Sequence, residues 1–116
     1  MKWRLVNKTR QSVLAGQVCC CYDFWKRTLG LLGKPKLSKE EVYWLRPCRS
    51  VHTFGMTYPI DLVVLDREDR VIAIAENMKP NRVSFFYPRA RSILEFISGP
   101  QRDCKVGDQL ILEEEL

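Results

Sequence analysis

Histidine is almost absent from this chain, since His52 is the only one among 116 residues. A single imidazole forms neither a histidine relay nor a set of histidine metal ligands. The 5 cysteines show neither the two-residue spacing of a zinc ribbon or redox motif nor the even count of a disulfide framework. We therefore expect reduced thiols, no bound metal and no cofactor.

Long uninterrupted apolar runs are also absent. Basic residues divide the first part of the chain, at Lys2, Arg4, Lys8 and Arg10. This pattern leaves no room for the core of a signal peptide or for a spanning helix. We therefore expect a cytoplasmic protein without a membrane span.

Neither sign of charge dominates the composition. The chain has 19 Lys and Arg against 14 Asp and Glu, a formal net charge of +5. The excess is spread along the chain, and no nucleic-acid-binding motif accompanies it, so a solvated basic face is expected and a nucleic-acid partner is not. Repeats, low-complexity segments and linkers are absent as well. The length then predicts a single domain over 1–116.

Short apolar segments bounded by turn residues predict seven or eight strands. They cover 3–6, 13–22, 42–45, 48–56, 60–65, 71–75, 92–97 and 109–113. A helix is predicted over 24–32, because Asp23 is a good N-cap and Gly33 a good stop. Closing such strands protects their edges. The sequence therefore predicts a mainly β fold, a small closed or nearly closed antiparallel barrel-like sheet.

The longest apolar strand signal lies in a predicted hairpin over 60–75. Its first strand, 60–65, is apolar almost throughout, which is typical of a strand covered on both faces. Asp61 interrupts this run, where a carboxylate requires a partner. The turn that follows lacks glycine, so Asp69 is predicted to take the left-handed conformation.

Four motifs occur in register along the chain. They are His52-Thr53-Phe54-x-Met56-x-x-Pro59-Ile60-Asp61, Arg27-x-x-Gly30-Leu31-Leu32, Ile93-Leu94-Glu95-Phe96 followed by Gly99, and Val106-Gly107-Asp108. Together they resemble the prokaryotic domain of unknown function 192 family over roughly residues 10–113. The resemblance implies a small, mainly β, barrel-like domain with one or two short helices, and it implies no activity. Two features depart from the family: Leu32 replaces the more usual methionine, and the leader or anchor of many relatives is not seen.

The first of these motifs holds the candidate site. In an extended strand one side carries Cys48, Ser50, His52, Phe54 and Met56, and the other carries Arg49, Val51 and Thr53. Cys48 would lie about 13 Å from His52 along such a strand, too far for one shared zinc ion. The candidate ligand-binding residues are His52, Phe54, Met56, Pro59, Asp61 and Arg49.

Two functions remain open for this site. The first is a non-enzymatic module that binds a small ligand or a protein partner. Aromatic side chains either fill the core or line an apolar pocket beside basic residues that suit an anion or an acidic peptide. Those aromatic and basic residues are Trp44, Tyr58, Phe85, Phe86, Tyr87, Arg46, Lys79, Arg82, Arg89 and Arg91. The alternative is a hydrolase-type enzyme in which Asp61 orients His52 as a general base, although the same pair would also serve as a structural hydrogen bond.

The cysteines offer a weaker signal. Cys19, Cys20 and Cys21 are interpreted as small apolar side chains of a reduced core, with a redox or lipid-modified site as the alternative. Cys104 lies in a loop flanked by Lys and Arg, and nearby cations favour the thiolate. For that reason it looks the more reactive thiol, but it is predicted to be an unremarkable surface thiol.

Overall fold

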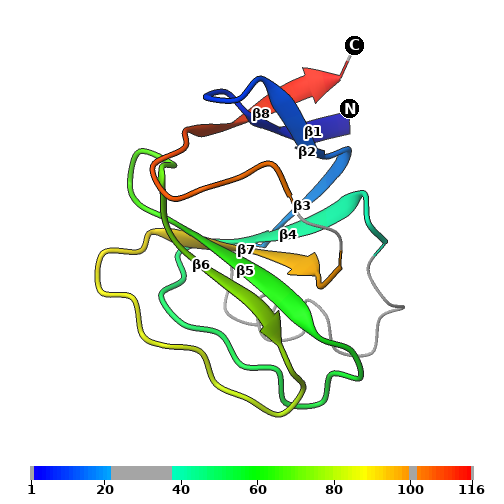
Figure 1. Ribbon diagram of the computed structural model, residues 1–116, viewed down its shortest axis with the longest axis vertical. Helices are drawn as coiled ribbons and strands as arrows, with labels where there is room; N and C mark the ends of the chain where they lie inside the picture. The colour runs from blue at the N-terminus through cyan, green and yellow to red at the C-terminus, as the bar shows by residue number, and fades with distance from the viewer. Residues whose placement is uncertain (1, 22–37, 100–101, 116) are drawn as a thin grey trace.

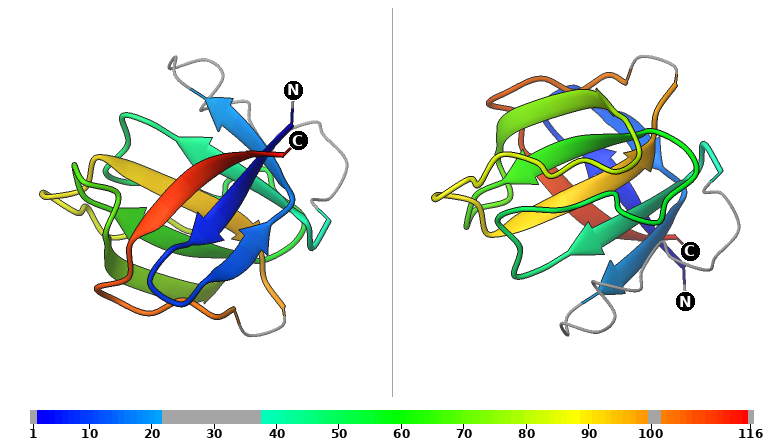
Figure 2. Two further views of the ribbon diagram at one scale, coloured as in Figure 1. Left: turned by 90° about the horizontal axis from the view of Figure 1, so that it is seen from above. Right: turned by 90° about the horizontal axis from the view of Figure 1, so that it is seen from below.

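The computed structural model describes residues 2–21, 38–99 and 102–115 and arranges them in two β-sheets (Figure 1). The smaller sheet contains β1 (Lys2–Asn7), β2 (Ser12–Ala15) and β8 (Leu110–Glu115), in the order β2-β1-β8. The larger sheet contains β3 (Gln17–Cys21), β4 (Glu41–Leu45), β5 (Ile60–Leu65), β6 (Val71–Met78) and β7 (Ser92–Ile97), in the order β3-β4-β7-β5-β6. Figure 2 shows the smaller sheet lying across one face of the larger one.

The expected closed antiparallel barrel is wrong in two respects. The strands form two separate sheets, and β3 runs parallel to β4. The reason lies in the segment predicted as one strand over 13–22. It divides at Gly16, so that β2 pairs with β1 while β3 pairs with β4 in the other sheet.

The short helices implied by the family resemblance are not found among the residues that the structure describes. The helix predicted over 24–32 lies outside them. In the same described ranges, no helix has the length and apolar character needed to span a bilayer.

One hydrophobic core fills the space between the two sheets. The smaller sheet contributes apolar side chains such as Leu5 and Leu110, and the larger sheet contributes Trp44, Leu65 and Phe96. All five are at most 3% exposed. Burial of this many large side chains is what holds the sheets together, because each contributes roughly 1.5–3 kcal/mol.

A second core lies on the opposite face of the larger sheet, where two long loops cover it. Side chains of the sheet such as Leu62 and Ile93 meet Val51, Met56 and Tyr58 of the first loop in this core. All six residues of β5 are consequently buried. This confirms the prediction that 60–65 is covered on both faces.

The central hairpin confirms the predicted turn. β5 pairs with β6, and Asp69 has a φ of 61° in the turn between them. The Asp66 carboxylate accepts hydrogen bonds from the backbone N–H groups of Glu68 and Arg70, which closes the turn without glycine.

The expected strand over 48–56 is not formed. In this segment only His52 makes a β-bridge, to Val83. Pro47 and Pro59 at its two ends offer no N–H to a ladder. Gly55, with a φ of 82°, turns the chain before Met56 and sends that side chain into the core.

Candidate functional site

The two long loops, residues 46–59 and 79–91, are joined by hydrogen bonds, and together they form what we call the loop layer. Thr53 is the centre of this connection and is fully buried. Its hydroxyl donates to the Lys79 carbonyl at 2.7 Å and accepts from the Arg82 N–H at 2.9 Å. Its backbone N–H donates to the Arg82 carbonyl, and its carbonyl accepts from the Asn81 N–H. Thr53 thus joins the loops through both its side chain and its backbone.

Further hydrogen bonds extend the loop layer away from Thr53. The Ser84 hydroxyl accepts from the Val51 N–H at 2.9 Å, and the Ser84 N–H donates to the Val51 carbonyl at 2.9 Å. The Tyr87 N–H donates to the Arg49 carbonyl at 2.8 Å. These bonds occupy backbone groups that no sheet pairs, and they fix the outer surface of the loops.

The outer surface carries exposed apolar side chains, which we call the aromatic face: His52, Phe54, Val83, Phe85 and Phe86. Phe54 is 50% exposed, Val83 63%, Phe85 81% and Phe86 64%. The imidazole of His52 stacks on Phe54, with ring centroids 5.4 Å apart. Leaving this much apolar surface in water has a cost that folding alone does not explain.

The alternation predicted from the sequence explains how the aromatic face forms. Val51 and Thr53 are buried on the inner side, while His52 and Phe54 between and beyond them are exposed. The bridge from His52 to Val83 places their side chains on the same side of the loop layer. The sequence thus predicted the direction of these side chains correctly, although it predicted a strand.

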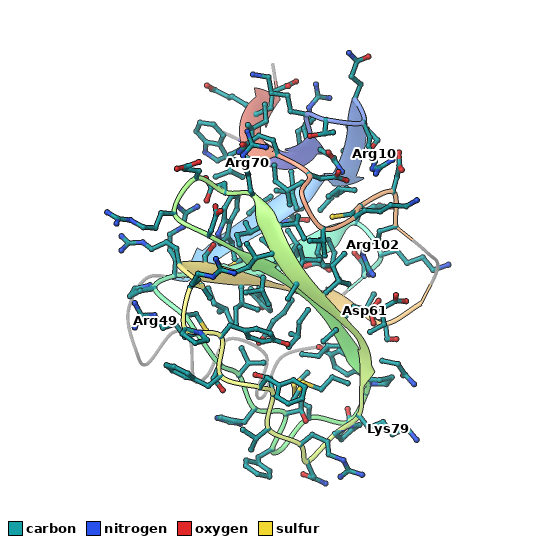
Figure 3. All side chains as sticks on the ribbon, turned by 60° about the vertical axis from the view of Figure 1, so that its left-hand side comes forward. Arg10, Arg49, Asp61, Arg70, Lys79 and Arg102 are labelled. Carbon is teal, nitrogen blue, oxygen red and sulfur yellow. The ribbon has the colours of Figure 1, made fainter. Side chains whose placement is uncertain are left out.

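The basic excess of the chain is concentrated in the loop layer. Residues 46–59 and 79–91 contain no Asp or Glu but six of the 19 Lys and Arg residues, which leaves 13 basic against 14 acidic residues elsewhere. Figure 3 shows Arg49 and Lys79 in the lower half of the molecule, well apart from Arg10 and Arg70. The excess is spread along the sequence, but six of the basic residues come together because residues 46–59 and 79–91 are hydrogen-bonded to each other in the loop layer.

Besides the buried Asp61, two of the predicted site residues lie wholly or partly inside the protein. Met56 is buried in the second core. Pro59 is half-buried, and its carbonyl accepts a hydrogen bond from Ser98. Both shape the loop layer from within, whereas Arg49, His52 and Phe54 are exposed.

Asp61 has partners other than His52. Its Oδ2 accepts a hydrogen bond from Arg102 Nη1 at 2.5 Å, and its Oδ1 accepts one from the Asn77 N–H at 2.7 Å. The Arg102 guanidinium also lies 4.2 Å from the centre of the Phe96 ring. Asp61 therefore orients Arg102, and His52 stacks on Phe54 instead. The His52–Asp61 contact that the hydrolase alternative requires is not formed.

Glu95 is a buried carboxyl that the sequence did not single out as part of the site. It lies on β7 between Tyr43 of β4 and Leu62 of β5, both members of the second core. Glu95 is 5% exposed, and no hydrogen bond or ion pair joins its carboxyl to another of the described residues. Burial raises its pKa to about 8.

Cys104 does not behave as its neighbours in the sequence suggest. Burial, followed by the negative charge of Asp108, raises the pKa of its thiol to about 11, although Arg10 and Arg102 act in the opposite direction. The expected surface thiol is thus half-buried, and its burial outweighs the nearby cations that favour the thiolate. Cys19 was expected to pack in a core, but it is exposed.

Three features of the candidate site could not be assigned from the sequence. Phe85 and Phe86 were ambiguous between core and surface, while Trp44 and Tyr58 are core. Arg102 carried no signal, because it meets Asp61 only through the fold. Thr53 was marked only by its place in the motif that begins at His52, and this place did not reveal its hydrogen bonds to the second loop.

Comparisons with known sequences find a family and relatives for this chain. The profile of the domain of unknown function 192 family, described as "Uncharacterized ACR", matches residues 5–112. A UPF0127 protein of Thermococcus sibiricus is 31% identical over 119 residues, covering 96% of this chain and 75% of its own length. A UPF0127 protein of Pyrococcus horikoshii is 32% identical over 111 residues, covering 91% and 96% respectively.

Two solved structures share the fold at low identity. A protein of unknown function from Novosphingobium aromaticivorans superposes with a TM-score of 0.73 at 16% identity, covering 94% of this chain and 82% of its own. A "putative transcription regulator" from Sinorhizobium meliloti superposes with a TM-score of 0.75 at 18% identity, covering 95% and 91%. At these identities the likeness concerns the fold alone.

Proposed function

Because this chain belongs to the domain of unknown function 192 family, whose name carries no activity, we propose its function from its own surface. It is a non-enzymatic binding module, and the aromatic face is its binding site. The observation that carries this proposal is the exposure of Phe54, Val83, Phe85 and Phe86 on loops that hydrogen bonds hold in place. A fixed apolar surface loses little conformational entropy when a partner covers it.

The partner that fits is a protein segment with both apolar and acidic side chains. The centre of the aromatic face is apolar, and Arg49, Lys79 and Arg82 lie next to it in the loop layer, which contains no acidic residue. An apolar centre with a polar rim is the usual anatomy of a protein interface. The cations would attract carboxylates and set the orientation of the segment.

The hydrolase alternative has no observation in its favour. A general base needs a group that orients it, and Asp61 is already engaged by Arg102 and Asn77. Nucleic acid is the other anionic partner to consider, because arginines beside exposed rings also bind single strands. The apolar side chain of Val83 in the middle of the surface favours a protein.

A selection from a random peptide display library tests this proposal. The protein would be immobilised, and every enriched peptide would then be titrated against a Phe85→Ser, Phe86→Ser double variant. We expect enriched peptides to combine Asp or Glu with aromatic or aliphatic residues. Loss of two aromatic anchors should weaken their binding by about 30-fold or more.

Controls separate the aromatic face from general stickiness. Val13, which is 54% exposed on β2 in the other sheet, offers a matched variant, and Val13→Ser should leave peptide affinity unchanged. The proposal fails when no peptide is enriched, or when enriched peptides bind the double variant equally well. Tighter retention of a single-stranded oligonucleotide, falling steeply with salt, would replace the protein partner with nucleic acid.

A further inference from the structure

A separate cavity of about 270 Å³ lies between β5, β6 and the segment after Gly99. Its lining includes Asp61 and Arg102 but no residue of the aromatic face. Figure 3 shows these two residues between the level of Arg10 and the level of Lys79. The cavity is somewhat smaller than the range of about 300–1,000 Å³ that is typical of drug-sized ligands. It is suited to one small metabolite.

One wall of the cavity is a fixed ion pair. Arg102 donates to Asp61 at 2.5 Å and to the Ile97 carbonyl at 2.5 Å, and it stacks on Phe96. The charges of Asp61 and Arg102 therefore compensate each other. This pair shapes the cavity but leaves no net charge for a ligand to neutralise.

The charges left for a ligand come from Glu76 of β6 and Lys105 of the opposing segment. Both side chains line the cavity and both are exposed. In the described part of the chain, neither the Glu76 carboxylate nor the Lys105 ammonium has an ion-pair partner. The cavity thus presents one unpaired charge of each sign from two different walls.

The rest of the lining is apolar. Val63, Ile74 and Val106 contribute branched aliphatic surface, and Val106 is 63% exposed at the rim. Cys104 adds a neutral thiol to the same lining. An aliphatic group in this position would cover surface that water now contacts, which is favourable by about 25 cal/mol per Å².

We propose that this cavity binds a small aliphatic zwitterion of the α-amino acid class. Its ammonium group would face Glu76, its carboxylate would face Lys105, and its side chain would lie against Val63, Ile74 and Val106. A simple anion would meet the repulsion of Glu76, and a simple cation that of Lys105. A zwitterion satisfies both groups at once.

Three ligands that share one side chain test the charge pattern. Leucine carries both charges, N-acetylleucine lacks the ammonium, and leucinamide lacks the carboxylate. Binding would be measured by titration followed in two-dimensional amide NMR spectra, in which leucine should shift the signals around Glu76 and Lys105. We expect each analogue to bind about three- to fivefold more weakly than leucine, the factor of an ion pair at an exposed site.

Two variants assign each charge to its residue. In Glu76→Gln, leucine and N-acetylleucine should bind equally, and in Lys105→Gln, leucine and leucinamide should. Both positions are exposed, so the fold should tolerate the changes. Glu114→Gln and Lys8→Gln, at exposed positions away from the cavity, should preserve the preference for leucine.

The proposal is overturned when about 10 mM leucine shifts no signals. This concentration is on the order of ten times the Kd of a ligand that binds with millimolar affinity. The proposal is also overturned when N-acetylleucine binds the unmodified protein as tightly as leucine does. The Phe85→Ser, Phe86→Ser double variant should still bind leucine. This result distinguishes failure of the cavity from failure of the aromatic face.

Discussion

The Thr53 hydroxyl accepts a hydrogen bond from the Arg82 N–H at 2.9 Å and so connects the two loops that cover the larger sheet. The same hydroxyl donates to the Lys79 carbonyl at 2.7 Å. Because Thr53 is fully buried in the loop layer, removing the hydroxyl leaves both backbone groups without this partner. A core interaction of this kind determines how the aromatic face on the other side of the loops is held.

Replacing Thr53 with valine should therefore weaken both stability and binding. Valine keeps the shape of threonine but leaves the Arg82 N–H and the Lys79 carbonyl without their partner, at a cost of about 1–3 kcal/mol. Thermal unfolding should show a fall in Tm of roughly 4–12 °C. Thr53→Ser, which keeps the hydroxyl, is the control and should retain peptide binding. Equal Tm values for the valine variant and the unmodified protein would contradict this role.

The ion pair between Asp61 and Arg102 gives a second prediction. The side chains are 6% and 17% exposed, so Asp61→Leu leaves a mostly buried guanidinium without its carboxylate partner. We expect a loss of about 3–5 kcal/mol in the free energy of unfolding, measured by chemical denaturation. The double variant Asp61→Leu, Arg102→Met should recover much of that loss. Additive effects of the two single changes would show that the pair is not coupled.

Much of the fold was predictable because its signals are local. β5 and β7 begin and end where apolar runs do, and Asp69 takes the left-handed turn position expected of it. The division of the segment over 13–22 was not predictable, since its composition does not indicate that β2 and β3 belong to different sheets. Sheet membership depends on distant partners, which one sequence does not reveal.

The candidate site was predictable only in part, for a similar reason. The alternation around His52 correctly placed His52 and Phe54 on the side opposite Val51 and Thr53. It is wrong for Met56, which is buried, and for Arg49, which is exposed. The partner of Asp61 was misassigned, because Arg102 lies 41 positions away in the chain. Basic residues that are scattered in sequence come together when residues 46–59 and 79–91 pair. This pairing does not involve regular strands, so no sequence pattern predicts it.

Cys104 should react slowly with alkylating reagents. With its pKa raised to about 11, roughly one thiol in a thousand is ionised at pH 8. Iodoacetamide labelling followed by peptide mass spectrometry should therefore modify the exposed Cys19 well before Cys104. In urea, where burial is lost, the two thiols should react at similar rates. Rapid labelling of Cys104 in the folded protein would mean that the cations beside it outweigh its burial.

Glu95 should make the stability of the protein depend on pH in the direction opposite to most carboxylates. Burial raises its pKa from the ordinary 4.5 to about 8, so folding takes up a proton between these values. The contribution is fully favourable below pH 4.5 and is lost as the pH rises to about 8. Glu95→Gln removes this loss and should raise the free energy of unfolding at pH 9 by up to about 5 kcal/mol.

Denaturation in urea from pH 5 to pH 9 measures this effect directly. The unmodified protein should lose stability over that range, while Glu95→Gln should lose much less. Glu114→Gln, at an exposed carboxylate of β8, is the matched control and should follow the unmodified protein. Parallel curves for Glu95→Gln and the unmodified protein would show that Glu95 is ionised at no cost in the folded state. A cation beside its carboxylate would then be required, which the uncharged side chains of the second core do not provide.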